Sequence, residues 1–142
     1  MTPIIRRTND KAFAENIIIQ NMSVYYNQLD MCWDTQLFAK QWDALDSYEL
    51  VINAARVGLL CINHDATAYY IRELQIDQHW QRQGLGTTAI RYTEEMAKQA
   101  GICLLRLRVF YINPAITLYE RLGFRICKTE DNTHYMERRI FN

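Results

Sequence analysis

The sequence has no excess of charge of either sign. Its 142 residues include 16 lysines and arginines and 16 aspartates and glutamates, and no basic run is longer than two residues. A surface that follows nucleic acid needs clustered positive charge to neutralise phosphates. We therefore do not expect nucleic acid as a partner.

Long apolar segments are also missing. The strictly apolar runs are only a few residues long, and Arg6, Arg7 and Asp10 lie close behind Met1. A membrane-spanning helix needs about 20 predominantly apolar residues, and a signal peptide needs an apolar central region. We expect neither of them in this sequence, no contact with a membrane, and a cytoplasmic location.

Paired cysteine motifs are absent too. The four cysteines, at positions 32, 61, 103 and 127, are widely spaced, lie in apolar runs and form no Cys-x-x-Cys pair. Zinc sites and disulfide frameworks require cysteines in an organised spacing. The pattern favours reduced thiols in the core, and it predicts no bound metal.

No internal repeat, low-complexity stretch or linker divides the chain. A length of 142 residues is enough for one sizeable hydrophobic core but not for a second one. Residues 1–142 are therefore predicted to form a single domain.

What the sequence does contain is a regular change in the spacing of its apolar residues. Helical spacing predicts helices after the capping residues Thr8-Asn9-Asp10 and over residues 35–45, 88–100 and 114–122. Alternation predicts strands at residues 3–7, 48–53, 57–62, 69–76, 104–110, 126–128 and 134–140, with turns near Ala55-Arg56 and His64-Asp65. Because a helix joins the strands 69–76 and 104–110, these two should be parallel. The expected fold is α+β, with a mixed, mostly antiparallel sheet of about six to seven strands and helices on both faces.

One loop combines glycines, basic and amide side chains and a helix start: Gln81-Arg82-Gln83-Gly84-Leu85-Gly86-Thr87. A strand, a glycine-containing loop and a helix form a phosphate cradle, because glycines let the backbone approach the anion and the first helical turn has unpaired N–H groups. Gly84-x-Gly86-x-x-Ala89 also fits the dinucleotide fingerprint. Two features are against that alternative: residues 77–83 separate the strand from the glycines, and residues 107–111 contain no carboxylate for a ribose.

The pattern Gln-x-x-Gly-x-Gly, here Gln81 to Gly86, resembles the pyrophosphate-binding signature of the GNAT superfamily of acetyl-CoA-dependent N-acetyltransferases. Two further blocks carry the resemblance over most of the chain: Leu74-Gln75-Ile76-Asp77 before the loop and residues 109–124 after it. Gln78 departs from the family, which often has proline at this position, and the segment 28–47 has no counterpart in the resemblance.

The resemblance implies that acetyl-CoA is the cosubstrate. Its pyrophosphate is expected at the backbone N–H groups of the loop, with further donors from the side chains of Gln81 and Arg82. The loop residues are Gln81, Arg82, Gln83, Gly84, Leu85, Gly86 and Thr87. Pantetheine is expected to pair with the exposed strand edge at Leu74, Gln75 and Ile76, where a free N–H would also face the thioester oxygen. Asn113 matches a family position that contacts CoA, but its place before Pro114 equally predicts a helix N-cap.

Two residues are candidates for the chemistry. Tyr119 matches the family's usual acid that protonates the departing sulfur of CoA, with a purely packing role on a helix as the alternative. Glu73 lies within an otherwise apolar strand, where a carboxylate is costly unless it is paired or used, so it is a candidate general base. The alternatives are an ion pair with Arg72, Arg106 or Arg108 and, for the role of base, a chain of water molecules.

The expected function is an N-acetyltransferase that moves the acetyl group of acetyl-CoA to a primary amine of a small molecule, directly within a ternary complex. Acetylation of a protein or peptide at its amino terminus or at lysine is one alternative, and a catalytically weak CoA-binding sensor is another. The sequence does not restrict the acyl group to acetyl. A homodimer through the C-terminal strands or the exposed helix faces is left open.

An acidic segment suggests a hypothesis for the acceptor. Between Leu29 and Leu50 only Lys40 opposes the acids Asp30, Asp34, Asp43, Asp46 and Glu49, and the aromatic residues nearby are Tyr25, Tyr26, Trp33 and Trp42. An acidic and aromatic wall would attract a cationic amine, with Asp30 or Asp34 in contact with it. The alternative is a solvated acidic helix face whose aromatic residues lie in the core.

Overall fold

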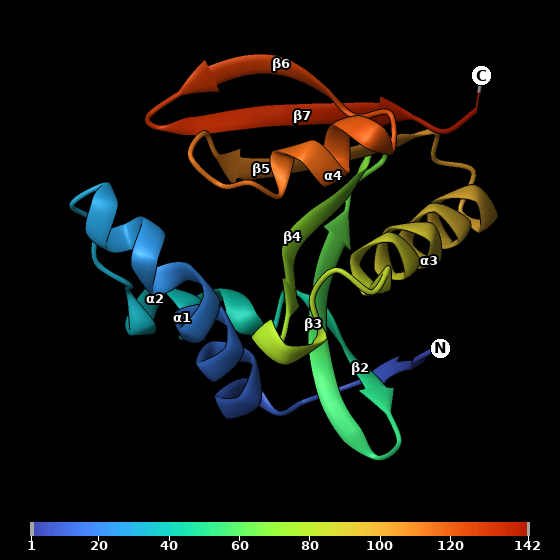
Figure 1. The fold of residues 1–142 in the computed structure, drawn as a ribbon. Coiled ribbons are helices and arrows are strands. Elements are labelled where there is room, and N and C mark those ends of the chain that lie inside the picture. The colour runs from blue at the N-terminus through green and yellow to red at the C-terminus, as the bar shows by residue number, and fades with distance from the viewer. Residues whose placement is uncertain (1, 142) are drawn as a thin grey trace.

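A seven-stranded sheet forms the centre of the structure (Figure 1), a computed structural model that describes residues 2–141. Its strands are β1 (Ile4–Arg7), β2 (Asp46–Ile52), β3 (Ala55–His64), β4 (Tyr69–Ile76), β5 (Leu104–Phe110), β6 (Arg125–Glu130) and β7 (Thr133–Arg139). They follow the order β1-β2-β3-β4-β5-β7-β6, and within residues 2–141 only β4 and β5 are parallel neighbours. The predicted mixed, mostly antiparallel sheet of an α+β fold is confirmed, and so is the parallel pair.

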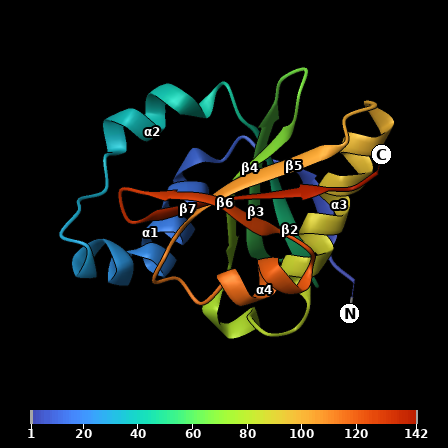
Figure 2. The same ribbon diagram turned by 90° about the horizontal axis from the view of Figure 1, so that it is seen from above.

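The helices cover both faces of this sheet. They are α1 (Lys11–Gln28), α2 (Thr35–Trp42), α3 (Leu85–Gln99) and α4 (Ile116–Arg121), with a short 3-10 helix η1 (Gln78–Trp80) before α3. Figure 2 shows α1 and α2 on one side of the sheet and α3 on the other. Aspartates begin the first two helices, because Asp10 accepts a hydrogen bond from the N–H of Phe13 and Asp34 from that of Leu37, each at 3.0 Å. No helix within residues 2–141 combines the length and apolar composition needed to cross a membrane.

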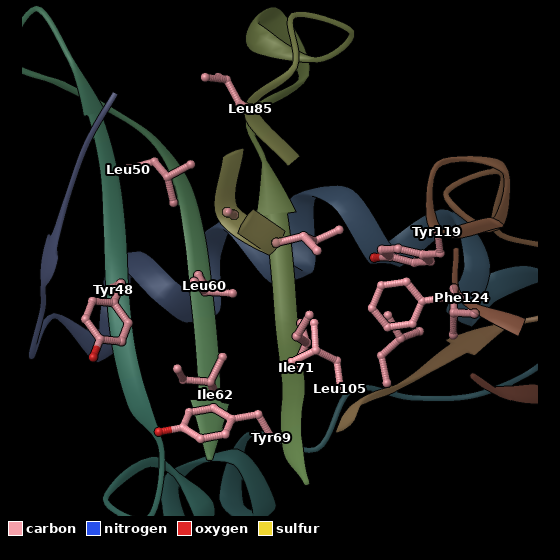
Figure 3. Close-up of a cluster of buried hydrophobic side chains, with 14 of the residues drawn as sticks. Tyr48, Leu50, Leu60, Ile62, Tyr69, Ile71, Leu85, Leu105, Tyr119 and Phe124 are labelled. Atoms are coloured by element: carbon pink, nitrogen blue, oxygen red, sulfur yellow. The ribbon is translucent and has the colours of Figure 1, made fainter. Parts of the chain in front are cut away.

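Two apolar clusters attach the helices to the sheet. The larger cluster, drawn in part in Figure 3, includes Leu60 and Ile62 of β3 and side chains of α3 and α4. The smaller cluster joins α1 and α2 to Leu59 and Cys61 of β3. Successive β3 residues therefore serve opposite faces, as the pleat of a strand requires. Each fully buried leucine or isoleucine stabilises the fold by about 1.5–3 kcal/mol, so the clusters on both faces of the sheet contribute to the stability of the fold.

The parallel strands β4 and β5 pair over only part of their length. Their register runs from Tyr69 opposite Leu105 to Ile71 opposite Leu107, and no pair follows in the described chain. On its other edge β4 stays paired with β3, but the register shifts there because Cys61 is opposite Glu73 while Ile62 is opposite Ile71. Arg72 is thus the extra residue of a β-bulge, which bends a strand and redirects its side chains. The sheet opens at this point.

Several predicted boundaries need correction. The β2–β3 turn lies at Asn53-Ala54 rather than at Ala55-Arg56, and both turn residues have positive φ, 50° and 67°. A two-residue hairpin turn that follows the twist of the strands requires this conformation at both positions, and asparagine adopts it more readily than most residues. The prediction was wrong because Ala54 gives no such signal.

Helix starts and ends also differ from the prediction. α2 ends at Trp42 rather than near residue 45, α3 begins at Leu85 rather than at residue 88, and α4 begins at Ile116 rather than at Pro114. In α3 the N-cap is Gly84, whose φ of 82° needs glycine, and the hydroxyl of Thr88 donates to its carbonyl at 3.1 Å. Before α4 the Asn113 side chain accepts from the N–H of Ala115 at 2.9 Å and closes a turn rather than the helix itself.

The predicted burial of all four cysteines is also wrong. Cys61 is buried in the smaller cluster and Cys103 is half-buried, whereas Cys32 and Cys127 are exposed. Cys127 follows the apolar Ile126 in the sequence, but every residue of its strand β6 is exposed at the edge of the sheet. All four are free thiols.

Candidate active site

A cleft of about 1300 Å³ occupies the opening between β4 and β5. One wall is formed by α1 and β4, the other by β5 and α4, and the loop before α3 and the β6–β7 turn lie at its rim. The cleft brings together nearly all the residues that the sequence selected for CoA and for catalysis. These are Glu73, Leu74, Gln75, Ile76, Gln81, Arg82, Gly84, Leu85, Gly86, Thr87, Asn113 and Tyr119, whereas Gln83 does not line it.

The loop before α3 is held in an unusual backbone conformation. Arg82 has a φ of 64° and Gly84 a φ of 82°, both in the left-handed region. Helix α3 starts directly after Gly84, so the first N–H groups of the helix and of the loop can meet an anion at the rim of the cleft. The side chain of Gln81 donates to the carbonyl oxygen of Ile76 at 3.0 Å and ties the loop to the end of β4.

The two glycines of this loop have different roles. A Cβ on Gly84 would contact nothing within 4 Å, so only its positive φ demands glycine. A Cβ on Gly86 would lie 3.0 Å from Cδ2 of Leu118, so this glycine allows α3 to approach α4. The sequence predicts a role for Gly86 in the close approach of phosphates, and the structure adds a packing reason at the same position.

The free edge of β4 offers backbone groups to a ligand. The backbone N–H of Asp77 donates to the carbonyl oxygen of Val57 of β3 at 2.8 Å, so the backbone N–H and C=O of its neighbour Ile76 point away from β3, into the cleft. By the alternation of strand hydrogen bonds, the N–H and C=O groups of Leu74 also point there. The carbonyl of Ile76 already accepts from Asn21 at 2.9 Å and from Gln81, which leaves its N–H and both groups of Leu74 for a ligand.

Glu73 is half-buried next to the bulge of β4 and lines the cleft. Burial raises the pKa of its carboxyl to about 7, against the opposing effects of a hydrogen bond from Gln75 and the positive charge of Arg108. Within residues 2–141 it forms no ion pair with Arg72, Arg106 or Arg108. Arg106 pairs with Glu137 instead, at 2.7 Å. The ion-pair alternative for Glu73 is therefore not the arrangement in this structure.

A chain of side-chain amides leads to Glu73. The Nδ2 group of Asn21 on α1 donates to Oε1 of Gln75 at 3.1 Å, and Nε2 of Gln75 donates to Oε1 of Glu73 at 3.1 Å. The backbone fixes the direction of this chain, because Nδ2 of Asn21 also donates to the carbonyl of Ile76, which can only accept. The cost is that Oδ1 of Asn21 is buried without a partner among the described residues. The arrangement ensures that Gln75 presents a donor, and not its oxygen, to Glu73.

Tyr119 on α4 is buried and also lines the cleft. Its ring packs edge-on against Phe124 with centroids 6.0 Å apart, as Figure 3 shows. Burial, with a smaller effect from the charge of Glu73, raises the pKa of its hydroxyl to about 12. The packing role and access to the cleft therefore coexist, and the hydroxyl keeps its proton at neutral pH.

The proposed acidic wall for a cationic acceptor is not formed. Neither Asp30 nor Asp34 lines the cleft, and Asp34 is engaged as the N-cap of α2. Asp46 and Glu49 pair with Arg7 and Arg6, each at 2.8 Å, on the strands farther from the opening. Of the four aromatic residues, Tyr25 and Tyr26 line the cleft, whereas Trp33 and Trp42 pack against the smaller cluster.

Among the cleft residues that the sequence does not assign to the site are Asn21, Arg72 and Arg108. The two arginines enter the sequence analysis only as possible ion-pair partners of Glu73, and Tyr26 only as part of the acidic wall. Tyr26 contacts Phe110 of β5 edge-on, with ring centroids 5.5 Å apart, and burial and the charge of Glu73 raise the pKa of its hydroxyl. A polar Asn21 within the helical spacing of α1 was a weak signal, since it interrupts the apolar face.

Comparison with known proteins gives a consistent result. The model of the family described as "Acetyltransferase (GNAT) family" matches residues 18–124, which is more than half of the chain. No curated protein matches the sequence. Among solved structures, PaiA N-acetyltransferase from Thermoplasma acidophilum in complex with coenzyme A superposes with a TM-score of 0.79 at 15% identity, over 98% of this chain and 99% of that one.

Two further structures have different acceptors in their names. The ribosomal-protein-S18-alanine N-acetyltransferase from Escherichia coli gives a TM-score of 0.74 at 21% identity, over 99% of this chain and 96% of that one. Arabidopsis thaliana Naa50 in complex with the bisubstrate analogue CoA-Ac-MVNAL gives a TM-score of 0.72 at 17% identity, over 97% of this chain and 99% of that one. Identities this low establish a common fold and nothing about the acceptor.

Proposed function

The chain belongs to the acetyltransferase (GNAT) family, a family of acyltransferase enzymes that use acetyl-CoA, and on this premise we propose that it acetylates the primary amine of a small molecule. The acetyl group would pass directly from the thioester to the amine in a ternary complex. The observation that supports acetyl transfer to an amine most strongly is the shared cleft of Glu73 and Tyr119, in which burial has raised the pKa of the carboxyl to about 7.

Acetyl-CoA would enter along the rim formed by the loop before α3. Its pyrophosphate would meet the N–H groups from Arg82 to Thr87, where the left-handed Gly84 leads into the helix. The pantetheine arm would pair with the free edge of β4 at Leu74 and Ile76, and Asn113 lies on the α4 side of the same cleft. One of the N–H groups on that edge would stabilise the oxyanion of the tetrahedral intermediate.

Glu73 would act as the general base. An amine arrives largely as ammonium, and it must lose a proton before its nitrogen can attack the thioester carbon. A carboxylate with a pKa of about 7 is better matched to that task near neutral pH than an ordinary glutamate. The ammonium gives this first proton to Glu73, which releases it to solvent. As the new carbon–nitrogen bond forms and the carbon–sulfur bond breaks, the nitrogen loses a second proton, which is balanced by the proton that the departing thiolate takes up.

Tyr119 would serve the leaving group. Since its hydroxyl stays protonated until about pH 12, it can donate a hydrogen bond to the departing thiolate and supply its proton. The different pKa values, about 7 for Glu73 and about 12 for Tyr119, separate the two roles, because one group is poised to accept a proton and the other to give one.

Two other functions stay open as proposals. Naa50 was solved with a peptide-like bisubstrate analogue, so a peptide or protein amine is the second candidate acceptor. A catalytically weak CoA-binding sensor is the third, and the presence of both Glu73 and Tyr119 in the cleft argues against it. We also propose that residues 1–142 act as one domain, because strands of the same seven-stranded sheet contribute to both walls of the cleft.

The test is release of free CoA thiol from acetyl-CoA in the presence of a panel of amino acids, polyamines, amino sugars and short peptides. We expect turnover with at least one small amine that exceeds hydrolysis without an acceptor. Turnover with peptides alone would favour the second candidate. Tight CoA binding without turnover on any acceptor would favour the sensor.

A further inference from the structure

Two arginines at the opening between β4 and β5 have no carboxylate partner among residues 2–141. Arg72 on β4 and Arg108 on β5 are both exposed, and both line the cleft. The ion pairs found within residues 2–141 include neither of them. Arg106, only two residues before Arg108, is by contrast paired with Glu137 at 2.7 Å. The two arginines therefore offer positive charge to whatever enters the cleft.

The strand register brings these arginines to the same place. Ile71 and Leu107 are the last parallel pair, so Arg72 and Arg108 are the next residue on each strand, at the point where the strands separate. Tyr70 and Arg106, one step earlier, are also paired, and side chains two residues apart share a face. This face of the sheet is the one that α1 covers, because Tyr70 is paired with Asn63, which lies two residues after Cys61 on the α1 side of β3.

Both guanidinium groups are held in position by neighbouring side chains. Arg72 stacks over the ring of Tyr70, with its Cζ 4.4 Å from the ring centroid, and its Nε donates to Oδ1 of Asn63 at 2.9 Å. Arg108 lies over the ring of Tyr135 at 6.0 Å. The terminal nitrogens of Arg72 are not used by these contacts, and a planar carboxylate can bind such a pair of nitrogens with two hydrogen bonds.

The charges of the two arginines also affect each other. Burial and the positive charge of Arg108 lower the pKa of Arg72. Two neighbouring cations are unfavourable in the free protein unless an anion lies between them. Glu130 and Asp131 line the cleft as well, but Glu130 is the last residue of β6 and Asp131 lies on the β6–β7 turn, and the ammonium of Lys128 is 3.9 Å from Glu130.

We propose that Arg72 and Arg108 bind a carboxylate that the acceptor carries close to its reacting amine. The inference rests on the proposed function, and it replaces the hypothesis of an acceptor with additional positive charge. Glu73 follows Arg72 directly at the bulge, so an amine at Glu73 and an anion at Arg72 would be separated by only a few bonds. A free amino acid has this arrangement, and so does a peptide with an acidic residue next to its amino terminus.

The experiment compares acceptors that differ only in the carboxylate. Free amino acids are paired with their carboxamides, and peptides with aspartate as their second residue are paired with peptides that have asparagine there. We expect kcat/KM to be on the order of 10-fold to 100-fold higher for the acid of whichever pair is accepted, as loss of hydrogen bonds to a charged group implies. Which pair is accepted identifies the source of the carboxylate.

Substitutions then assign the preference to the arginines. Arg72→Met and Arg108→Met should each remove most of the preference for the acid, and Arg108→Glu should reverse it. Because Arg108 also influences the pKa of Glu73, the ratio between matched acceptors is measured, in which any common effect on the base cancels. Arg125→Met on the exposed strand β6 removes an equal charge outside the cleft and should leave the ratio unchanged.

The outcomes separate this inference from the proposed function. Equal kcat/KM for acid and amide, or an acid preference that survives both methionine variants, would overturn the inference while acetyl transfer itself still stands. Absence of transfer to any amine would instead remove the proposed function. A preference that falls in Arg72→Met and Arg108→Met but not in Arg125→Met supports the assignment.

Discussion

The hydrogen bond from Gln75 to Glu73 gives a sharp test of the proposed general base. This bond, at 3.1 Å, favours the charged form of the carboxylate and opposes the effect of burial. Gln75→Met keeps most of the side-chain volume but removes the donor, so the pKa of Glu73 should rise. A hydrogen bond to a charged group contributes about 1.5 kcal/mol, and 1.36 kcal/mol corresponds to one pKa unit, so we expect a rise of about one unit.

The rise in the pKa of Glu73 should be visible in the acidic limb of the pH profile of kcat/KM. A general base must be deprotonated, so kcat/KM falls about tenfold for each pH unit below its pKa. The limb of the unmodified protein is expected at about pH 7. Gln75→Met should therefore be about tenfold slower at pH 6 and nearly unaffected above pH 9. Ionisation of the acceptor is common to both proteins and cancels in their ratio.

Asn21 should act through the same carboxylate. Asn21→Ala frees the Gln75 amide to rotate, which should also raise the pKa of Glu73 and so shift the acidic limb of the kcat/KM profile to higher pH. In a Glu73→Gln background neither substitution should have any effect on the pH profile. Gln99→Met, at the exposed end of α3, is the matched control for the change of residue type.

Two results would refute this reasoning in different ways. A limb that persists in Glu73→Gln would show that another group is the base. A limb that disappears in Glu73→Gln but does not move in Gln75→Met or Asn21→Ala would show that the amide chain only attaches α1 to β4. In that case the substitutions would lower stability or raise the KM for acetyl-CoA, with no change in the pH profile.

Three further predictions follow from the same geometry. Tyr119→Phe should lower kcat on the order of tenfold to a thousandfold with little change in the KM for acetyl-CoA. Tyr92→Phe, a matched change of a half-buried tyrosine outside the cleft, should leave kcat unchanged, and equal kcat in both variants would exclude Tyr119 as the acid. Gly84→Ala and Gly101→Ala, both at positive φ in open space, should each cost about 1–2 kcal/mol of the free energy of unfolding, and calorimetry should find weaker CoA binding only for the first. In denaturant titrations Glu73→Gln should stabilise the protein at pH 8 by at most about 3 kcal/mol and have little effect at pH 4.5. The reason is that the buried charge of Glu73 destabilises the fold progressively as pH rises from 4.5 to about 7. Equal effects on stability at both pH values would contradict this prediction.

The parts of the fold that the sequence predicted are those with local causes. Strand 104–110 and strand 69–76 were predicted with their observed limits, because their flanking turns and apolar periods are local signals. The loop before α3 was recognised from its two glycines. The turn at Asn53-Ala54 was misplaced, because its conformation is imposed by the pairing of β2 with β3 and not by an alanine.

The parts of the site that sequence did not predict depend on contacts between distant segments. Asn21 and Gln75 are 54 positions apart, and nothing local indicates that they meet. The bulge at Arg72 depends on the register with β3. Counting charges likewise misled the reading of residues 30–49, because a count cannot show that Asp34 is used to cap its own helix.

The opening in the sheet explains why these groups gather where they do. Strands β4 and β5 stop pairing just before Arg72 and Arg108, and the bulge turns Glu73 toward the same space. A continuous sheet covered by helices on both faces would tolerate neither an unpaired glutamate nor two neighbouring arginines, since each would be buried without a partner. Where the strands separate, the same residues reach a cleft that a ligand can fill. The local loss of sheet pairing is thus both a cost in stability and the condition that allows polar groups to be placed next to one another for chemistry.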